Sequence, residues 1–193
     1  MIAALVLAAG RGARFSSGAN KLLEDLLGRP VLRHVVDAAL ASRAHETIVV
    51  TGHDVLRIEA ALAGLPLRFV YNPDYAEGLA SSLRVGVACA GEFDGVLVLL
   101  GDMPGVAPPT LDRLIDAFET TGAAAAVPTH DGRRGNPVLI GRSLFPSIAQ
   151  LSGDAGARGL LRARDDVIEI ETGDPGVLAD VDTPEDLAAW RRR

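Results

Sequence analysis

The 193-residue chain is 48% hydrophobic but only 4% aromatic, and it carries a formal net charge of −6 at pH 7. This length and apolar content predict one domain, residues 1–193, with a core of Ala, Val, Leu and Ile. The acidic balance argues against a nucleic-acid-binding protein, which normally has a basic face. The single cysteine, Cys89, excludes an internal disulfide and cysteine-rich zinc sites. The apolar stretch Met1–Gly10 lacks a positively charged start and is too short to cross a bilayer, which favours the cytoplasm and no membrane partner.

Short apolar runs alternate with amphipathic stretches along the chain. Near-continuous apolarity without strict alternation is typical of strands covered on both faces, as in a parallel sheet. Apolar stripes with helical spacing follow Pro30, over 31–40, and Pro108-Pro109, over 111–118. The strands predicted in this part are Ala3–Leu7, Thr47–Thr51, Leu67–Tyr71, Val96–Leu100 and Ala124–Val127.

The later part of the chain is less regular. Gly132–Gly141 and Val167–Thr172 are predicted strands separated by a short helix around Leu144–Ala149, with an antiparallel strand expected at the sheet edge. Val177–Val181 is predicted as a further strand, and Thr183–Arg192 as a final helix that begins with a capping box. The whole pattern predicts an α/β fold with three layers, α/β/α, and a mostly parallel sheet with one antiparallel strand.

The loop Ala8–Lys21 is the first candidate functional segment, because ligands of such folds bind beyond the carboxyl ends of the parallel strands. Small residues let the backbone approach a phosphate, and Arg11, Arg14 and Lys21 bring positive charge to it. A dinucleotide fingerprint is disfavoured because Phe15 occupies the third glycine position. A Walker loop is excluded by the absence of Gly-Lys-Ser/Thr.

Two aspartates at other strand ends are candidate magnesium ligands. Asp102 follows the apolar strand Val96–Leu100, where a buried carboxylate is costly unless it is paired or metal-bound. Asp182 is the preferred second ligand, with Asp180 as the alternative two residues earlier. Hard divalent cations are typically held by one or two carboxylates plus substrate phosphates, which suits this pair.

Six motifs in order make the chain resemble the MobA-like nucleotidyltransferases, and within them the molybdenum cofactor cytidylyltransferases. The resemblance covers almost the full length. The motifs are Leu7–Gly10 with Arg14 and Lys21, Asn72–Gly78 with Ser81–Leu83, Gly101–Pro104, Gly135–Val138, Ser152–Arg158 and Asp182–Asp186.

The resemblance implies a Rossmann-like nucleotidyltransferase fold and transfer of CMP or GMP from a nucleoside triphosphate to a phosphorylated acceptor, with release of pyrophosphate. The acceptor implied is molybdopterin, the metal Mg²⁺ or Mn²⁺, and the nucleotide CTP rather than GTP, since guanine-selective relatives tend to carry Leu-Ala-Gly-Gly where Leu7–Gly10 reads Leu-Ala-Ala-Gly. A molybdenum hydroxylase that receives the product is a conceivable partner, but no residue indicates it.

The expected roles divide the chain into a nucleotide-binding part, about 1–105, and an acceptor-binding part, about 106–193. Catalysis is assigned to Arg14, Lys21 and Asp102, and metal binding to Asp102 and Asp182. Acceptor binding is assigned to Asn136, Pro137, Asp154 and Arg158. Nucleotide binding is assigned to Leu7, Ala8, Ala9, Gly10, Arg11, Arg14, Lys21, Asn72, Gly78, Ser81 and Ser82.

Two alternatives stay open. One is a nucleotidyltransferase of the same fold that uses GTP or another acceptor, such as a sugar 1-phosphate. The other is a protein that delivers the cofactor without catalysing transfer.

Overall fold

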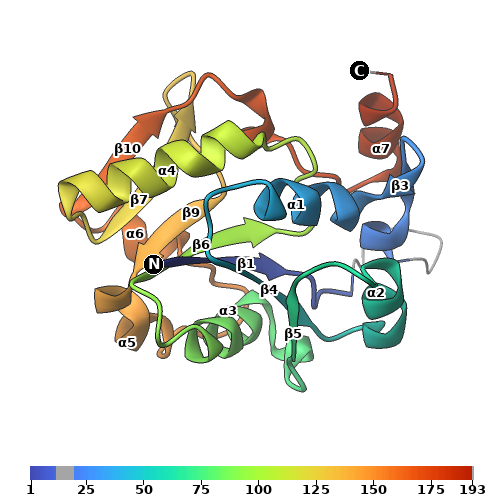
Figure 1. The fold of residues 1–193 in the computed structure, drawn as a ribbon, viewed down its shortest axis with the longest axis horizontal. Helices are drawn as coiled ribbons and strands as arrows, with labels where there is room; N and C mark the ends of the chain where they lie inside the picture. The colour runs from blue at the N-terminus through green and yellow to red at the C-terminus, as the bar shows by residue number, and fades with distance from the viewer. Residues whose placement is uncertain (12–19, 193) are drawn as a thin grey trace.

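The computed structural model describes residues 1–11 and 20–192. One large sheet runs through the described part, with strand order β10-β7-β9-β6-β1-β4-β5 and β8 paired to β7 (Figure 1). The strands are β1 (Ile2–Leu7), β4 (Glu46–Thr51), β5 (Arg68–Tyr71), β6 (Gly95–Leu100), β7 (Ala125–His130), β8 (Arg133–Arg134), β9 (Val138–Gly141) and β10 (Val167–Glu171), and a separate small hairpin joins β2 (Asp25–Leu26) to β3 (Arg29–Pro30).

Helices cover both faces of the sheet, which gives the three layers expected (Figure 1). Side chains of α1, α2 and α4 share one apolar cluster with one face of the strands, whereas α3, α5 and α6 share the other. The helices are α1 (Val31–Leu40), α2 (Val55–Ala61), α3 (Leu79–Cys89), α4 (Pro108–Thr121), α5 (Phe145–Ile148), α6 (Arg158–Arg162) and α7 (Pro184–Trp190), with 3₁₀ turns η1 (Lys21–Leu23), η2 (Tyr75–Glu77), η3 (Arg142–Leu144) and η4 (Pro175–Leu178).

The central strands are parallel, as their apolar runs predict. β1 pairs in parallel with β4 on one side and β6 on the other, and all six residues of β1 are buried. The carboxyl ends of β1 and β6 therefore lie side by side, where Gly101 donates its backbone N–H to the Leu7 carbonyl at 3.0 Å. A Cβ on Gly101 would lie 2.9 Å from that carbonyl, so the close approach requires glycine.

The antiparallel strand is β9, and it lies inside the sheet rather than at its edge. It pairs antiparallel with β6 and with β7, so the prediction of an edge position was wrong. The predicted strand Gly132–Gly141 is divided into β8 and β9, and the interruption at 135–137 includes a cis peptide bond between Asn136 and Pro137.

The predicted strand Val177–Val181 is also wrong. Pro175 to Leu178 form the turn η4, which Asp174 caps by accepting a hydrogen bond from the Gly176 N–H. The backbone beyond it pairs with loops instead of a ladder, since Val181 donates to the Asp102 carbonyl at 2.8 Å. Val177 and Val181 are both buried, as the apolar pattern indicates. They lie in a turn and in an extended segment, and neither belongs to a strand.

The capping box of the last helix is confirmed. Thr183 Oγ1 accepts from the Asp186 N–H, and Asp186 Oδ2 accepts from the Thr183 N–H. Within the described ranges, no helix has both the length and the apolar character that crossing a membrane requires.

Candidate active site

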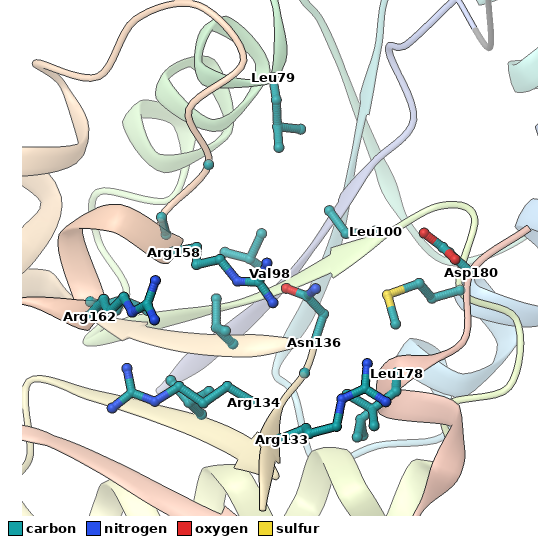
Figure 2. Close-up of a pocket in the computed structure, with 18 of the residues that line it drawn as sticks. Leu79, Val98, Leu100, Arg133, Arg134, Asn136, Arg158, Arg162, Leu178 and Asp180 are labelled. Atoms are coloured by element: carbon teal, nitrogen blue, oxygen red, sulfur yellow. The ribbon is translucent and has the colours of Figure 1, made fainter. Parts of the chain in front are cut away.

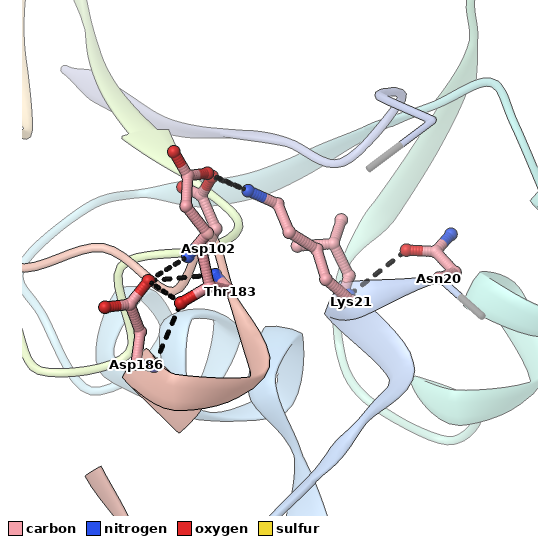
Figure 3. Close-up of polar contacts among 7 residues, drawn as sticks. Asn20, Lys21, Asp102, Thr183 and Asp186 are labelled. Carbon is pink, nitrogen blue, oxygen red and sulfur yellow. Dashed lines mark hydrogen bonds and ion pairs between the residues drawn. The ribbon is translucent and has the colours of Figure 1, made fainter. Parts of the chain in front are cut away.

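Lys21, Asp102 and Asp182 meet at the carboxyl edge of the central strands. The Lys21 ammonium donates to Asp102 Oδ2 and to Asp182 Oδ1, each at 2.7 Å (Figure 3). The three side chains are 14%, 21% and 30% exposed respectively. Residues 81 and 161 positions apart in the chain thus converge on one half-buried point. Asp102 follows β6 as predicted, whereas Asp182 lies on the extended segment that pairs with the Asp102 loop and does not follow a strand.

Backbone hydrogen bonds fix this meeting point. The Val181 N–H donates to the Asp102 carbonyl, which holds the segment that carries Asp182 against the loop after β6. The capping box then holds that segment to α7, because the Asp182 N–H also donates to Asp186 Oδ2. Asn20 sets the turn that carries Lys21, since its Oδ1 accepts from the Leu22 N–H at 3.1 Å.

The charges at this point shift the pKa values of the groups around it. Burial alone lowers the pKa of Lys21, but the charges of Asp102 and Asp182 and the hydrogen bonds to them outweigh burial and raise this pKa above its ordinary value. Burial raises the pKa of Asp180, and the negative charge of Asp182 raises it further. Three carboxylates therefore lie near one ammonium group.

Asp102 Oδ1 is buried and has no hydrogen-bond partner within residues 1–11 and 20–192. An unsatisfied buried carboxylate oxygen is costly and is a natural position for a metal ion. No group of three or more His, Cys, Asp or Glu side chains in the described ranges has the arrangement of a complete metal site. Two aspartates would therefore need phosphate or water oxygens to complete the coordination of a hard cation, as is usual for Mg²⁺.

A cavity of about 890 Å³ borders this site through Met103 and Asp180, but Lys21, Asp102 and Asp182 do not line it. Its floor is apolar, with Leu7, Leu100 and Met103 from the ends of the central strands, and Asp180 lies on its wall. Figure 2 shows Asp180 and Arg162 on opposite sides of the residues drawn. Asn136, which the sequence analysis assigned to acceptor binding, lines the cavity between them.

Four arginines line the cavity: Arg133, Arg134, Arg158 and Arg162. Arg134 is paired with Glu169 at 2.7 Å, whereas no ion pair joins the other three to a carboxylate within the described part of the chain. The sequence analysis named only Arg158. The spacing of Arg158 and Arg162, four apart on α6, would have placed both on one helix face.

Other residues predicted for acceptor binding lie beside the cavity. Pro137 is buried in the turn before β9 and does not line the cavity. Asp154 lies at Gly78, where an added Cβ would approach Asp154 Oδ1 to 2.6 Å and the Gly153 carbonyl to 2.5 Å. Gly78 has φ +107°, so both its conformation and this packing require glycine.

The predicted nucleotide-binding residues around α3 form a network of their own. Asn72 is fully buried and donates to Ser81 Oγ at 2.9 Å and to Ser82 Oγ at 3.0 Å. Ser81 in turn donates to the Gly78 carbonyl. These polar side chains fix the turn before α3, so their hydrogen-bonding groups are largely committed to one another.

The described part of the first loop lies near an aromatic residue that the sequence analysis did not single out. The Arg11 guanidinium lies 5.5 Å from the centre of the Tyr75 ring, a cation–π contact. Ala8 and Ala9 are buried, and Ala9 accepts a hydrogen bond from the His53 N–H. Among residues 1–11 and 20–192, no atom lies within 4 Å of the position that a Cβ on Gly10 would occupy. Arg14 lies outside the described residues.

The comparisons with known proteins identify the class of protein to which this fold and this cluster of a lysine and two aspartates belong. Residues 4–167 match the MobA-like NTP transferase domain, and the chain belongs to this family.

The chain is similar over nearly its whole length to a curated protein and to a solved structure. It is 33% identical to nicotine blue oxidoreductase of Paenarthrobacter nicotinovorans, covering 96% of this chain and 94% of that protein. The crystal structure of Rv0371c from Mycobacterium tuberculosis H37Rv superposes with a TM-score of 0.89 at 32% identity, covering 100% of this chain and 97% of that one. Rv0371c was also solved in complex with manganese, with a TM-score of 0.84, 30% identity and coverage of 99% and 98%. A further relative is the bifunctional protein GlmU of Halorhodospira halophila, 38% identical over 134 residues, which are 68% of this chain and only 28% of GlmU.

Proposed function

We propose that this protein transfers a nucleotidyl group, CMP from CTP, to a phosphorylated acceptor of the molybdopterin type and releases pyrophosphate. The observation that carries the proposal is the meeting of Lys21, Asp102 and Asp182 beside a cavity lined with arginines. Membership of the MobA-like NTP transferase family supports the reaction class.

Asp102 and Asp182 are the residues that would hold Mg²⁺ or Mn²⁺. Their carboxylate oxygens suit a hard cation, and Asp102 Oδ1, which has no partner among the described residues, fits a ligand role. The manganese complex of Rv0371c supports divalent metal use in a related structure. When bound, such a metal supplies positive charge to the phosphates.

The protein's own task is to bring two anions together. Repulsion between unit charges about 4 Å apart is roughly 4 kcal/mol near a protein surface. Lys21, Arg11 and Arg14 would neutralise the triphosphate, with Leu7–Gly10 as its backbone cradle. Catalysis then consists of positioning the acceptor phosphate in line with the α-phosphorus, without a nucleophilic side chain.

The cavity is the proposed acceptor site. Asn136 and Arg158 line it, and its apolar floor would contact the body of an acceptor larger than a phosphate. In this division residues of about 1–105 bind the nucleotide and residues of about 106–193 the acceptor, with Asp182 reaching back to the nucleotide part. The network of Asn72, Ser81 and Ser82 would shape the base site through the turn before α3.

A substrate screen tests this proposal. The protein is supplied with Mg²⁺ and either CTP or GTP, each with molybdopterin or with sugar 1-phosphates, and pyrophosphate is measured. We expect release with CTP and molybdopterin. Release only with GTP or with a sugar phosphate would correct the substrate, and binding of molybdopterin without pyrophosphate from any nucleotide would indicate a delivery protein.

A second candidate function follows from the full-length similarity to a protein named nicotine blue oxidoreductase. In this reading the cavity binds an organic oxidant or reductant, and a nicotinamide nucleotide takes the place of the triphosphate. The test is the oxidation of NADH or NADPH in the presence of nicotine blue, followed by absorbance. Turnover there, with no pyrophosphate from any nucleotide, would favour the oxidoreductase.

A further inference from the structure

Lys21 is the only lysine in a chain with 19 lysine and arginine residues. It lies where two carboxylates converge, with its Nζ 2.7 Å from one oxygen of each. A lysine ammonium is a compact point charge, whereas the planar guanidinium of arginine forms a broad fork. The one compact cationic side chain of the protein thus lies between the two aspartates proposed as metal ligands.

The acids need a cation at this point. Asp180 adds a third carboxylate, since its charge interacts with those of both Asp102 and Asp182. The Lys21 side chain is only 14% exposed, so water screens the group poorly. Without the ammonium, three partly buried carboxylates would repel one another.

We propose that Lys21 is a displaceable internal cation, which holds Asp102 and Asp182 together in the free protein and leaves them when metal and nucleotide bind. The inference rests on the proposed metal site and deepens it. Lys21 contacts Asp102 Oδ2 and Asp182 Oδ1, so its ammonium stands where a divalent cation that bridges the two carboxylates would lie. A triphosphate gives the withdrawn ammonium a new anionic partner.

The consequence is coupled binding. The free protein binds a divalent cation weakly because Lys21 competes for the same oxygens, and a nucleotide that attracts Lys21 removes this competition. Couplings of this kind typically change an affinity by about 5–150-fold, and they act equally in both directions.

The first test measures Mn²⁺ binding without nucleotide by electron paramagnetic resonance. Lys21→Met keeps the apolar stem and removes the ammonium, so we expect Mn²⁺ to bind about tenfold more tightly or better than to the unmodified protein. Arg57→Met is the matched control, because it removes one positive charge from an exposed position on α2. Adding Asp102→Asn to Lys21→Met should abolish the gain. Equal or weaker Mn²⁺ binding in Lys21→Met than in the control would overturn the proposal.

The second test needs no variant and so does not depend on whether Lys21→Met folds. Lysine labelled with nitrogen-15 at the side chain gives a single Nζ signal, since the chain has one lysine. We expect this signal to shift when Mg²⁺ and a non-hydrolysable CTP analogue are added together, and to shift less with Mg²⁺ alone. A signal unchanged by both together would show that the metal is held elsewhere, for example on Asp102 Oδ1 alone.

These outcomes separate the inference from the proposed function. Pyrophosphate release combined with an unmoved lysine signal would leave the transferase in place and remove the displacement. A shifted lysine signal with no pyrophosphate from any nucleotide would support the displacement of Lys21 and contradict the transferase reaction.

Discussion

Asp102 occupies a position that a structural turn does not explain. Its Oδ2 is paired with Lys21, while its buried Oδ1 has no hydrogen-bond partner in the part of the chain that the structure describes. A residue selected only for the turn after β6 would satisfy its buried oxygens. The proposed role of Asp102 as a metal ligand would account for this unsatisfied oxygen.

Replacing Asp102 with asparagine keeps the shape of the side chain and removes its charge. We expect Asp102→Asn to lower the rate of pyrophosphate release by about 10²–10³-fold, the usual loss when one preorganised electrostatic group is removed from an active site. Asp165→Asn, on an exposed turn, is the control and should keep the full rate. A rate within a few-fold of normal for Asp102→Asn would exclude it as a metal ligand.

Asn72 acts on stability as well as on the proposed base site. It joins the end of β5 to the start of α3 through hydrogen bonds to Ser81 and Ser82, and the Asp74 N–H donates to its Oδ1. Asn72→Ala leaves these buried partners unsatisfied, so we expect the free energy of unfolding to fall by about 1–3 kcal/mol. Urea denaturation measures this change, and a loss below about 0.5 kcal/mol would contradict the network.

At the scale of elements, regular apolar patterns predicted the structure well and irregular ones did not. The runs that became β1, β4 and β6 are buried on both faces, and the stripe 31–40 became α1. The run that became β5 lies at the sheet edge and is only partly buried. Val177–Val181 is equally apolar, but Pro175 and Gly176 begin a turn and the backbone pairs with loops. Apolar residues indicate that a segment is buried. A buried segment forms a strand only where a neighbouring strand pairs with it.

The start of α7 gives a prediction for pH dependence. Hydrogen bonds from Thr183 stabilise the Asp186 carboxylate and hold its pKa below the ordinary value of 3.8. Because the folded-state pKa is lowered, this stabilisation is fully present above pH 3.8 and is lost as the pH falls through the lowered pKa. Asp186→Ala should lower the free energy of unfolding by about 1 kcal/mol at pH 7.

The measurement is thermal unfolding of both proteins from pH 7 downward. The difference between them should shrink below pH 3.8. A difference that stays constant, or that grows as the pH falls, would show that the charge of Asp186 does not support the cap.

At the scale of the whole molecule, the sequence predicted where the site lies but not how its side chains pair with one another. The ends of neighbouring parallel strands lie at the same edge of a sheet, which placed Asp102 and the first loop together. Asp182 was expected there for the wrong reason, because no strand directly precedes it. The ion pairs of Lys21 with both aspartates depend on the side-chain conformations in the folded protein, which no local sequence pattern predicts. The cavity is assembled from β1, α3, β6, β8, α6 and η4, so most of its arginines could not be recognised before the elements were packed.

The arginines of the cavity allow a matched comparison. We expect Arg158→Ala to raise the KM for the acceptor by about tenfold with little change in the KM for CTP, the loss of roughly one charge-assisted hydrogen bond. Arg164→Ala is the control, because Arg164 is paired with Asp166 and does not line the cavity. If the two variants raise the acceptor KM equally, or if Arg158→Ala instead raises the KM for CTP, the cavity is not the acceptor site.

The most direct test is a crystal structure with Mn²⁺ and a non-hydrolysable CTP analogue, with the metal located by its anomalous scattering. The account predicts one peak in contact with Asp102 and Asp182, and a triphosphate along the loop 8–21 with Lys21 turned toward it. A peak away from both aspartates, or a nucleotide lying among Arg133, Arg158 and Arg162 in the cavity, would contradict it.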